Sequence, residues 1–188
     1  GISLATNTLN RKQYASEGKR FAFSFDVFSL TETLEPGNTS VKTESEKTGH
    51  NFFRAKVSLE QYFLKGVFST GYFVEGVLSN QDSFSSYTAS IINAPGFFAI
   101  QDSRTLLLEN FRAFNYASGG IRNVFRIKKS FDFRLEGYVF KPLETITEGS
   151  NQEASLKQNL SDIYFAATAG LVLHSSVGPI SLSLNYYD

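Results

Sequence analysis

The stretch Ser130–Phe140 constrains the fold more than any other part of the chain, because its apolar and polar side chains alternate strictly. Successive side chains of a β-strand point to opposite faces, so this stretch predicts a strand with one apolar face. The opposite face carries three charged residues, Asp132, Arg134 and Glu136. Charges in a row on one face suit the wall of a water-filled barrel, with phenylalanines facing lipid.

The same alternation recurs along the chain and predicts about eight antiparallel strands in a meander. The predicted strands are Ile2–Leu9, Lys19–Leu30, Asn51–Phe63, Val67–Ser79, Ile121–Lys128, Phe131–Pro142, Ile163–His174 and Ile180–Tyr187. These segments have the length expected of strands that cross a bilayer, whereas no apolar run reaches the length of a membrane helix. The fold class is therefore predicted to be all-β.

The connections between the predicted strands alternate between short and long. This asymmetry is typical of outer-membrane barrels, which have tight periplasmic turns and long extracellular loops. We predict one domain over residues 1–188, an antiparallel transmembrane β-barrel segment located in the bacterial outer membrane. The predicted extracellular loops are 31–49, 80–120 and 144–161, and Asn10–Gly18 is predicted to be a polar periplasmic connection.

A soluble β-barrel that binds a hydrophobic ligand is the alternative, since its strands alternate too. Its apolar faces would point inward and its charged faces outward. Phenylalanine and leucine dominate the apolar faces of nearly every predicted strand. Small residues such as Ala166, Gly170 and Ser181 on the opposite faces suit a barrel interior but would cover a soluble surface poorly. These two features favour the membrane barrel.

Charge and composition exclude several classes of function. The chain has 18 basic and 18 acidic residues, so nothing indicates a nucleic-acid partner. It has no cysteine, which excludes thiol chemistry and disulfides. Its two histidines, His50 and His174, lie at opposite ends of the predicted strands and cannot form one metal or catalytic site. We predict no cofactor, no metal and no catalytic residue.

Several segments in a fixed order resemble a known family. They are Asn7–Tyr14, Glu109–Ala113, Arg134–Phe140, Ala169–Ser183 and Gly178–Asp188. This order resembles the C-terminal half of the bacterial surface antigen barrels, the superfamily of outer-membrane assembly factors and two-partner secretion transporters. It is most similar to the barrel of patatin-like phospholipases of Gram-negative outer membranes. The resemblance covers nearly the whole chain and rests on order and spacing, not on any single motif.

The resemblance implies a sixteen-stranded barrel whose sixth extracellular loop folds back into the interior. In this family an arginine in a Val-Arg-Gly-Phe/Tyr motif at the loop tip pairs with an acidic residue on an inner strand face. Arg112 matches that arginine, with Phe111 and Ala113 in place of the valine and glycine. Glu136 matches the acidic residue. The expected interaction is therefore an Arg112–Glu136 ion pair that holds the loop inside.

A cluster of charged residues is predicted beside Glu136 on the inner face. Asp132 and Arg134 share its strand, and Arg122 and Arg126 lie on the neighbouring strand. Cross-strand ion pairs within such a cluster can fix the register of the two strands. The same cluster can also form a polar network on which the loop carrying Arg112 docks.

The resemblance implies that the chain anchors, and in addition displays or translocates, an attached patatin-like lipase domain. The alternative within the superfamily is an outer-membrane protein insertase or a secretion pore. The lipase nucleophile lies in a Gly-x-Ser-x-Gly turn, and the chain contains no such motif, so it is predicted not to be an enzyme.

The family has one more strand after a segment like Gly178–Asp188, and the chain begins at Gly1 within a strand-like segment. We therefore expect a fragment or processed piece that forms an incomplete barrel. Exposed strand edges are not tolerated in lipid. The expected partners are the lipid bilayer and, along the edge strands, the missing half of the barrel or another chain.

Overall fold

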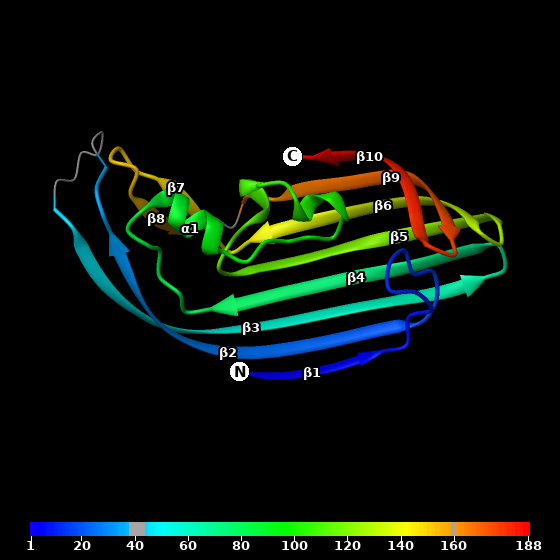
Figure 1. The fold of residues 1–188 in the computed structure, drawn as a ribbon, viewed down its shortest axis with the longest axis horizontal. Helices are drawn as coiled ribbons and strands as arrows, with labels where there is room; N and C mark the ends of the chain where they lie inside the picture. The colour runs from blue at the N-terminus through cyan, green and yellow to red at the C-terminus, as the bar shows by residue number, and fades with distance from the viewer. Residues whose placement is uncertain (38–43, 159–160) are drawn as a thin grey trace.

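The computed structural model describes residues 1–37, 44–158 and 161–188. Within these residues, eight strands form one antiparallel sheet in which every neighbour in space is also the next of these strands along the chain (Figure 1). The sheet is curved and open, with β1 and β10 as its two edges. Residues 38–43 of the predicted loop 31–49, and 159–160 of the predicted loop 144–161, lie outside the described residues.

The prediction of an all-β fold with about eight antiparallel strands is confirmed. The strands are β1 (Ile2–Asn7), β2 (Lys19–Leu34), β3 (Glu46–Lys65), β4 (Phe68–Ser79), β5 (Tyr116–Lys128), β6 (Phe131–Pro142), β9 (Tyr164–Ser175) and β10 (Gly178–Tyr187). The strand β6 has the predicted bounds. Its alternating burial places the charged residues on the covered face and the apolar ones on the exposed face.

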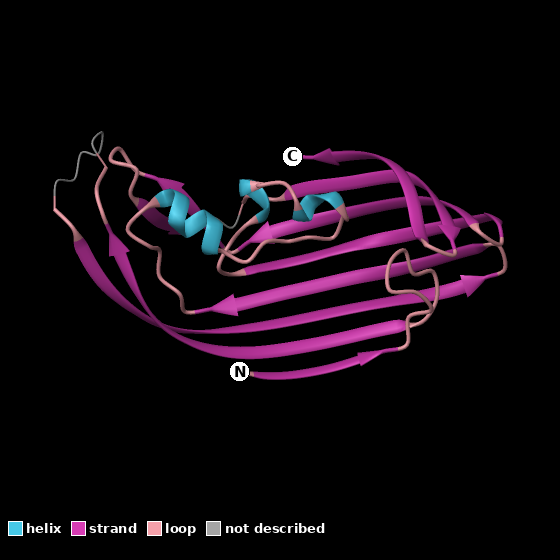
Figure 2. Cartoon of the chain, in the orientation of Figure 1, coloured by secondary structure: helices cyan, strands magenta, loops and turns pink. Residues whose placement is uncertain are grey.

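The three long connections contain more regular structure than predicted (Figure 2). The predicted loop 31–49 is shorter, because the β2–β3 pairing continues to Leu34 opposite Glu46. The predicted strand ended at Leu30 because polar residues follow it. Backbone hydrogen bonds between two strands do not depend on apolar side chains, so the pairing continues through these polar residues. The predicted loop 144–161 carries a separate hairpin of β7 (Glu144–Glu148) and β8 (Ala154–Gln158).

The connection between β4 and β5 contains one α-helix and two short 3-10 helices. They are α1 (Tyr87–Asn93), η1 (Asp102–Arg104) and η2 (Glu109–Phe111). The connection also ends earlier than the predicted loop 80–120, because β5 begins at Tyr116 and not at Ile121. None of the helices in the described part of the chain is long and apolar enough to cross a membrane.

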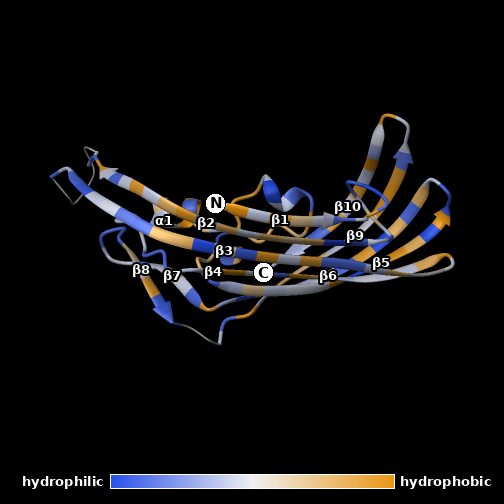
Figure 3. Cartoon of the chain, turned by 90° about the horizontal axis from the view of Figure 1, so that it is seen from below, coloured by the Kyte–Doolittle hydropathy of each residue, from blue (hydrophilic) through white to orange (hydrophobic). Residues whose placement is uncertain are grey.

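The sheet is apolar on its convex face and charged on its concave face, which is the face that carries the β4–β5 connection (Figure 1). Figure 3 shows how apolar and polar residues alternate along the strands. On the convex face, Leu182 and Leu184 are 76% and 80% exposed. On the concave face, Asp132 and Arg134 are 1% and 4% exposed. This distribution is the reverse of what water favours for a soluble sheet.

The hydrophobic core lies between the β4–β5 connection and the concave face of the sheet. Its buried members are Val77, Phe97, Ile100, Phe111, Ala113, Tyr116, Tyr138, Phe140 and Ala166. The ring of Phe140 is 5.9 Å from that of Phe97 and 5.7 Å from that of Phe111, measured between centroids. The aromatic residues of the connection therefore fold inward onto the sheet and do not extend into solvent.

Two neighbouring glycines provide a test of this packing. A Cβ atom on Gly120 would lie 2.5 Å from the carbonyl oxygen of Gly137 and closer still to the Tyr138 ring, whereas a Cβ on Gly137 would meet nothing within 4 Å. We expect Gly120→Ala to lower the free energy of unfolding by about 1–3 kcal/mol, because the Tyr138 ring must move within the core. Gly137→Ala, the matched control, should change it by less than about 0.5 kcal/mol. Urea unfolding midpoints measure both, and equal effects would contradict the packing described here.

Candidate functional site

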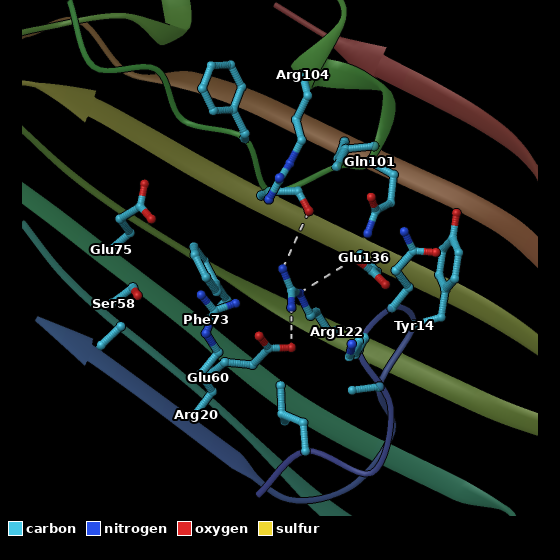
Figure 4. Close-up of a pocket in the computed structure, with 18 of the residues that line it drawn as sticks. Tyr14, Arg20, Ser58, Glu60, Phe73, Glu75, Gln101, Arg104, Arg122 and Glu136 are labelled. Carbon is cyan, nitrogen blue, oxygen red and sulfur yellow. Dashed lines mark hydrogen bonds and ion pairs between the residues drawn. The ribbon is translucent and has the colours of Figure 1, made fainter. Parts of the chain in front are cut away.

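Arg122 is the centre of a buried ion-pair network on the concave face (Figure 4). The register of β5 and β6 places it directly opposite Glu136. Its Nη1 donates to Glu60 of β3, and its Nε lies 2.7 Å from the Tyr138 hydroxyl and 3.6 Å from Oε2 of Glu136. A largely covered guanidinium, on a side chain that is 12% exposed, is thus held between two carboxylates and a phenol oxygen.

Arg134 completes this network from the same strand as Glu136. Its Nε donates to Oε1 of Glu136 over 2.8 Å, and its Nη2 lies 3.4 Å from the Tyr62 hydroxyl. Tyr138 donates its hydroxyl hydrogen to the other oxygen of Glu136. Two arginines, Arg122 and Arg134, therefore neutralise two carboxylates, Glu60 and Glu136. We call these four residues the ion-pair network.

The predicted charged cluster is divided in the structure. Arg122, Arg134 and Glu136 meet, but Asp132 pairs with residues that the sequence did not assign to the cluster. Its Oδ2 lies 2.7 Å from Nε2 of His174 and 3.3 Å from Nη1 of Arg11. Arg126, which faces Asp132 in the register, donates to Ser16 Oγ over 3.1 Å instead.

Arg112 does not pair with Glu136, and the predicted interaction is replaced by another. Its Nη1 donates to the carbonyl oxygens of Ile91, Ile92 and Ala94 over 3.0–3.2 Å. These carbonyls belong to the C-terminal end of α1, where helix carbonyls lack intrahelical partners and carry partial negative charge. The guanidinium also lies over the Phe98 ring, 5.7 Å from its centroid. Arg112 therefore caps a helix within the β4–β5 connection.

A second contact stabilises this connection internally. The Tyr87 hydroxyl donates to Oε2 of Glu109 over 2.8 Å. Burial, and then this hydrogen bond to a carboxylate, raise the pKa of Tyr87 to about 12.

The β4–β5 connection contacts the ion-pair network through its backbone, since Arg122 Nη2 lies 3.4 Å from the carbonyl oxygen of Ala99.

Residues 8–18 also cover the network, although Asn10–Gly18 was predicted to form only a periplasmic connection. Ala15 and Ser16 are buried, and Arg134 Nη1 donates to the Ala15 carbonyl oxygen over 2.9 Å. Ser69 donates to the Ser16 carbonyl oxygen over 2.5 Å. Tyr14 adopts a positive φ of 53° and donates its hydroxyl to Ser181 of β10 over 2.8 Å. No feature of the residues 8–18 predicted these long-range contacts.

A cavity of about 500 Å³ lies between the ion-pair network, residues 8–18 and η1. Residues of all eight strands of the large sheet line it, including Ser3 of β1 and Ser183 of β10. Asp102 of η1 connects the cavity wall to β10, since it accepts hydrogen bonds from Asn185 over 2.6 Å and Tyr187 over 2.5 Å. Across the described ranges, no group of three metal-ligating side chains is placed to hold a metal ion.

Comparisons with protein-family models, curated proteins and solved structures find no match to this chain. The inverted sheet and the charged cavity are therefore the observations from which a function can be inferred. Glu60 was not predicted to be a site residue, although its place on the polar face of the predicted strand Asn51–Phe63 indicated that it points into the interior. For Arg11 and Ala15, no pattern in the sequence indicated a contact with the concave face.

The network predicts which pairs of residues are energetically coupled. Arg134→Met and Glu136→Gln should each cost about 3–5 kcal/mol, because each leaves an unbalanced charge in the buried network. In a double-mutant cycle the two should couple by about 2 kcal/mol. Arg112→Met combined with Glu136→Gln should be additive within about 0.5 kcal/mol. Denaturant unfolding of all five variants measures these energies, and equal coupling in both cycles would refute the assignment.

Proposed function

We propose that the chain is a membrane-embedded part of a larger outer-membrane β-barrel. The inverted sheet is the observation that supports this proposal most directly. Exposed side chains such as Leu135, Val139 and Leu184 cover the convex face, whereas charged side chains are buried on the other. In water, exposed apolar surface of this extent is unfavourable, but in a bilayer the same surface contacts hydrocarbon and the concave face is shielded from it.

The open edges of the sheet support a barrel with further strands. Within the described residues, β1 pairs as a strand with β2 alone and β10 with β9 alone. Unpaired backbone groups are not tolerated in hydrocarbon, so each edge needs a partner strand from the remaining portion of the barrel or from another chain. A closed barrel of eight strands has an interior that side chains fill, with no room for residues 80–115.

The role we propose is to anchor an attached patatin-like lipase domain, as the resemblance of motif order suggests. The chain lacks the Gly-x-Ser-x-Gly turn, so it would contribute attachment and not catalysis. Residues 8–18 and the β4–β5 connection both cover the concave face and bond to the ion-pair network. Because two segments cover the concave face, we favour an anchor over the alternative of an open secretion pore.

Cysteine labelling tests the membrane placement, because the natural chain has no cysteine. The variant Leu135→Cys places a thiol on the convex face, and Ser58→Cys places one in the cavity wall. With the chain folded in lipid vesicles, a water-soluble maleimide should react much more slowly with the convex-face thiol than with the cavity thiol. In denaturant the two variants should react at the same rate, which controls for intrinsic reactivity.

The proposal fails if the chain remains monomeric in aqueous buffer without detergent. It also fails if the thiol at position 135 reacts in vesicles as fast as the thiol at position 58. Either result would favour the soluble barrel, whose convex face is in contact with water.

A further inference from the structure

The cavity on the concave face is lined by more basic than acidic side chains. The basic residues are Lys12, Arg20, Lys56, Arg104, Arg122 and Arg134. The acidic residues are Glu60, Glu75, Asp102 and Glu136. An electropositive concave surface attracts anions, because its walls focus the field of the charges that line it.

Ion pairing within the cavity wall separates neutralised charges from free ones. The ion-pair network accounts for two arginines and two glutamates, and Lys56 Nζ lies 3.0 Å from Oε2 of Glu75. Three basic residues remain, Lys12, Arg20 and Arg104, against a single acid, Asp102, whose carboxylate accepts hydrogen bonds from Asn185 and Tyr187. In the described part of the chain, none of these three has an acidic side chain at ion-pair distance. The excess of positive charge is therefore located on these three side chains.

The three free cations come from three different elements around the same space. Lys12 belongs to the segment 8–18, Arg20 to β2 and Arg104 to η1. Figure 4 shows Arg104 entering from the β4–β5 connection and Arg20 on the strand side, with Arg122 and Glu60 between them. Neutral hydrogen-bonding side chains complete this wall, namely Gln13, Ser58 and Gln101.

We propose that this cavity binds a small anion that carries phosphate groups, with Arg20, Arg104 and Lys12 as its ligands. A guanidinium presents parallel N–H donors that match the oxygens of a phosphate. Cations on separate walls fit a ligand with more than one anionic group better than a single carboxylate. The volume of about 500 Å³ is within the range of small-molecule sites. The proposal goes beyond the anchoring role, since it requires neither a bilayer nor an attached domain.

Isothermal titration calorimetry of the whole chain, folded in detergent micelles, tests this site. Two probes distinguish a free phosphate compound from a lipid headgroup: inorganic pyrophosphate, and a short-chain phosphatidic acid added to the micelles. Arg20→Gln and Arg104→Gln should each weaken binding about threefold to tenfold, because each removes one exposed charged ligand. Both arginines are exposed and unpaired, so urea unfolding should show that both variants remain folded.

Lys19→Gln is the matched control, because it removes the same charge from the adjacent residue of β2. Successive strand residues point to opposite faces, and Lys19 does not line the cavity. Binding of either probe that weakens in both arginine variants and not in the lysine variant supports the site. If pyrophosphate binds, the ligand is a free phosphate compound; if only phosphatidic acid binds, the ligand is a lipid headgroup. The proposal is overturned if neither probe binds at millimolar concentration, if the arginine variants bind as the natural chain does, or if Lys19→Gln weakens binding equally.

Discussion

The structure depends on the mutual neutralisation of buried charges on the concave face. Arg122 and Arg134 lie between Glu60 and Glu136, and the hydroxyls of Tyr62 and Tyr138 satisfy further hydrogen-bonding positions. An isolated buried charge costs several kcal/mol, so the four charges are tolerable only together. Because they come from β3, β5 and β6, their pairing fixes the position of three strands at once. A change in the register of these three strands would therefore also break the ion pairs that balance the buried charges.

The two segments that cover the concave face contact this network through neutral backbone groups. Arg134 donates to the carbonyl oxygen of Ala15, and Arg122 lies close to that of Ala99. Neither segment adds an acidic side chain to the network, so its charge balance is complete within the sheet. Of the basic residues in these segments, Arg11 pairs with Asp132 of the sheet, whereas Lys12 and Arg104 have no acidic side chain at ion-pair distance among the described residues. These unpaired cations give the cavity its positive charge.

The strands and their faces could be predicted because alternation with period two is a local property of the backbone. The Arg122–Glu136 contact was also accessible, since it joins neighbouring strands across a short turn. Glu60 was not linked to Arg122, because β4 lies between their strands and only the curvature of the sheet brings them together. The predicted Arg112–Glu136 pair does not form in the structure, because the carbonyls at the end of α1, a helix that was not predicted, bind Arg112.

The sequence by itself determined an all-β meander with one apolar and one charged side on nearly every strand. These features follow from side-chain alternation and from the lengths of the connections, which need no knowledge of distant contacts. The tertiary structure alone decided which charges pair, how residues 8–18 fold onto the concave face and which cations remain free. Those outcomes depend on the curvature of the sheet and on residues such as Arg11 and His174, which are far apart in the chain and contact the same carboxylate.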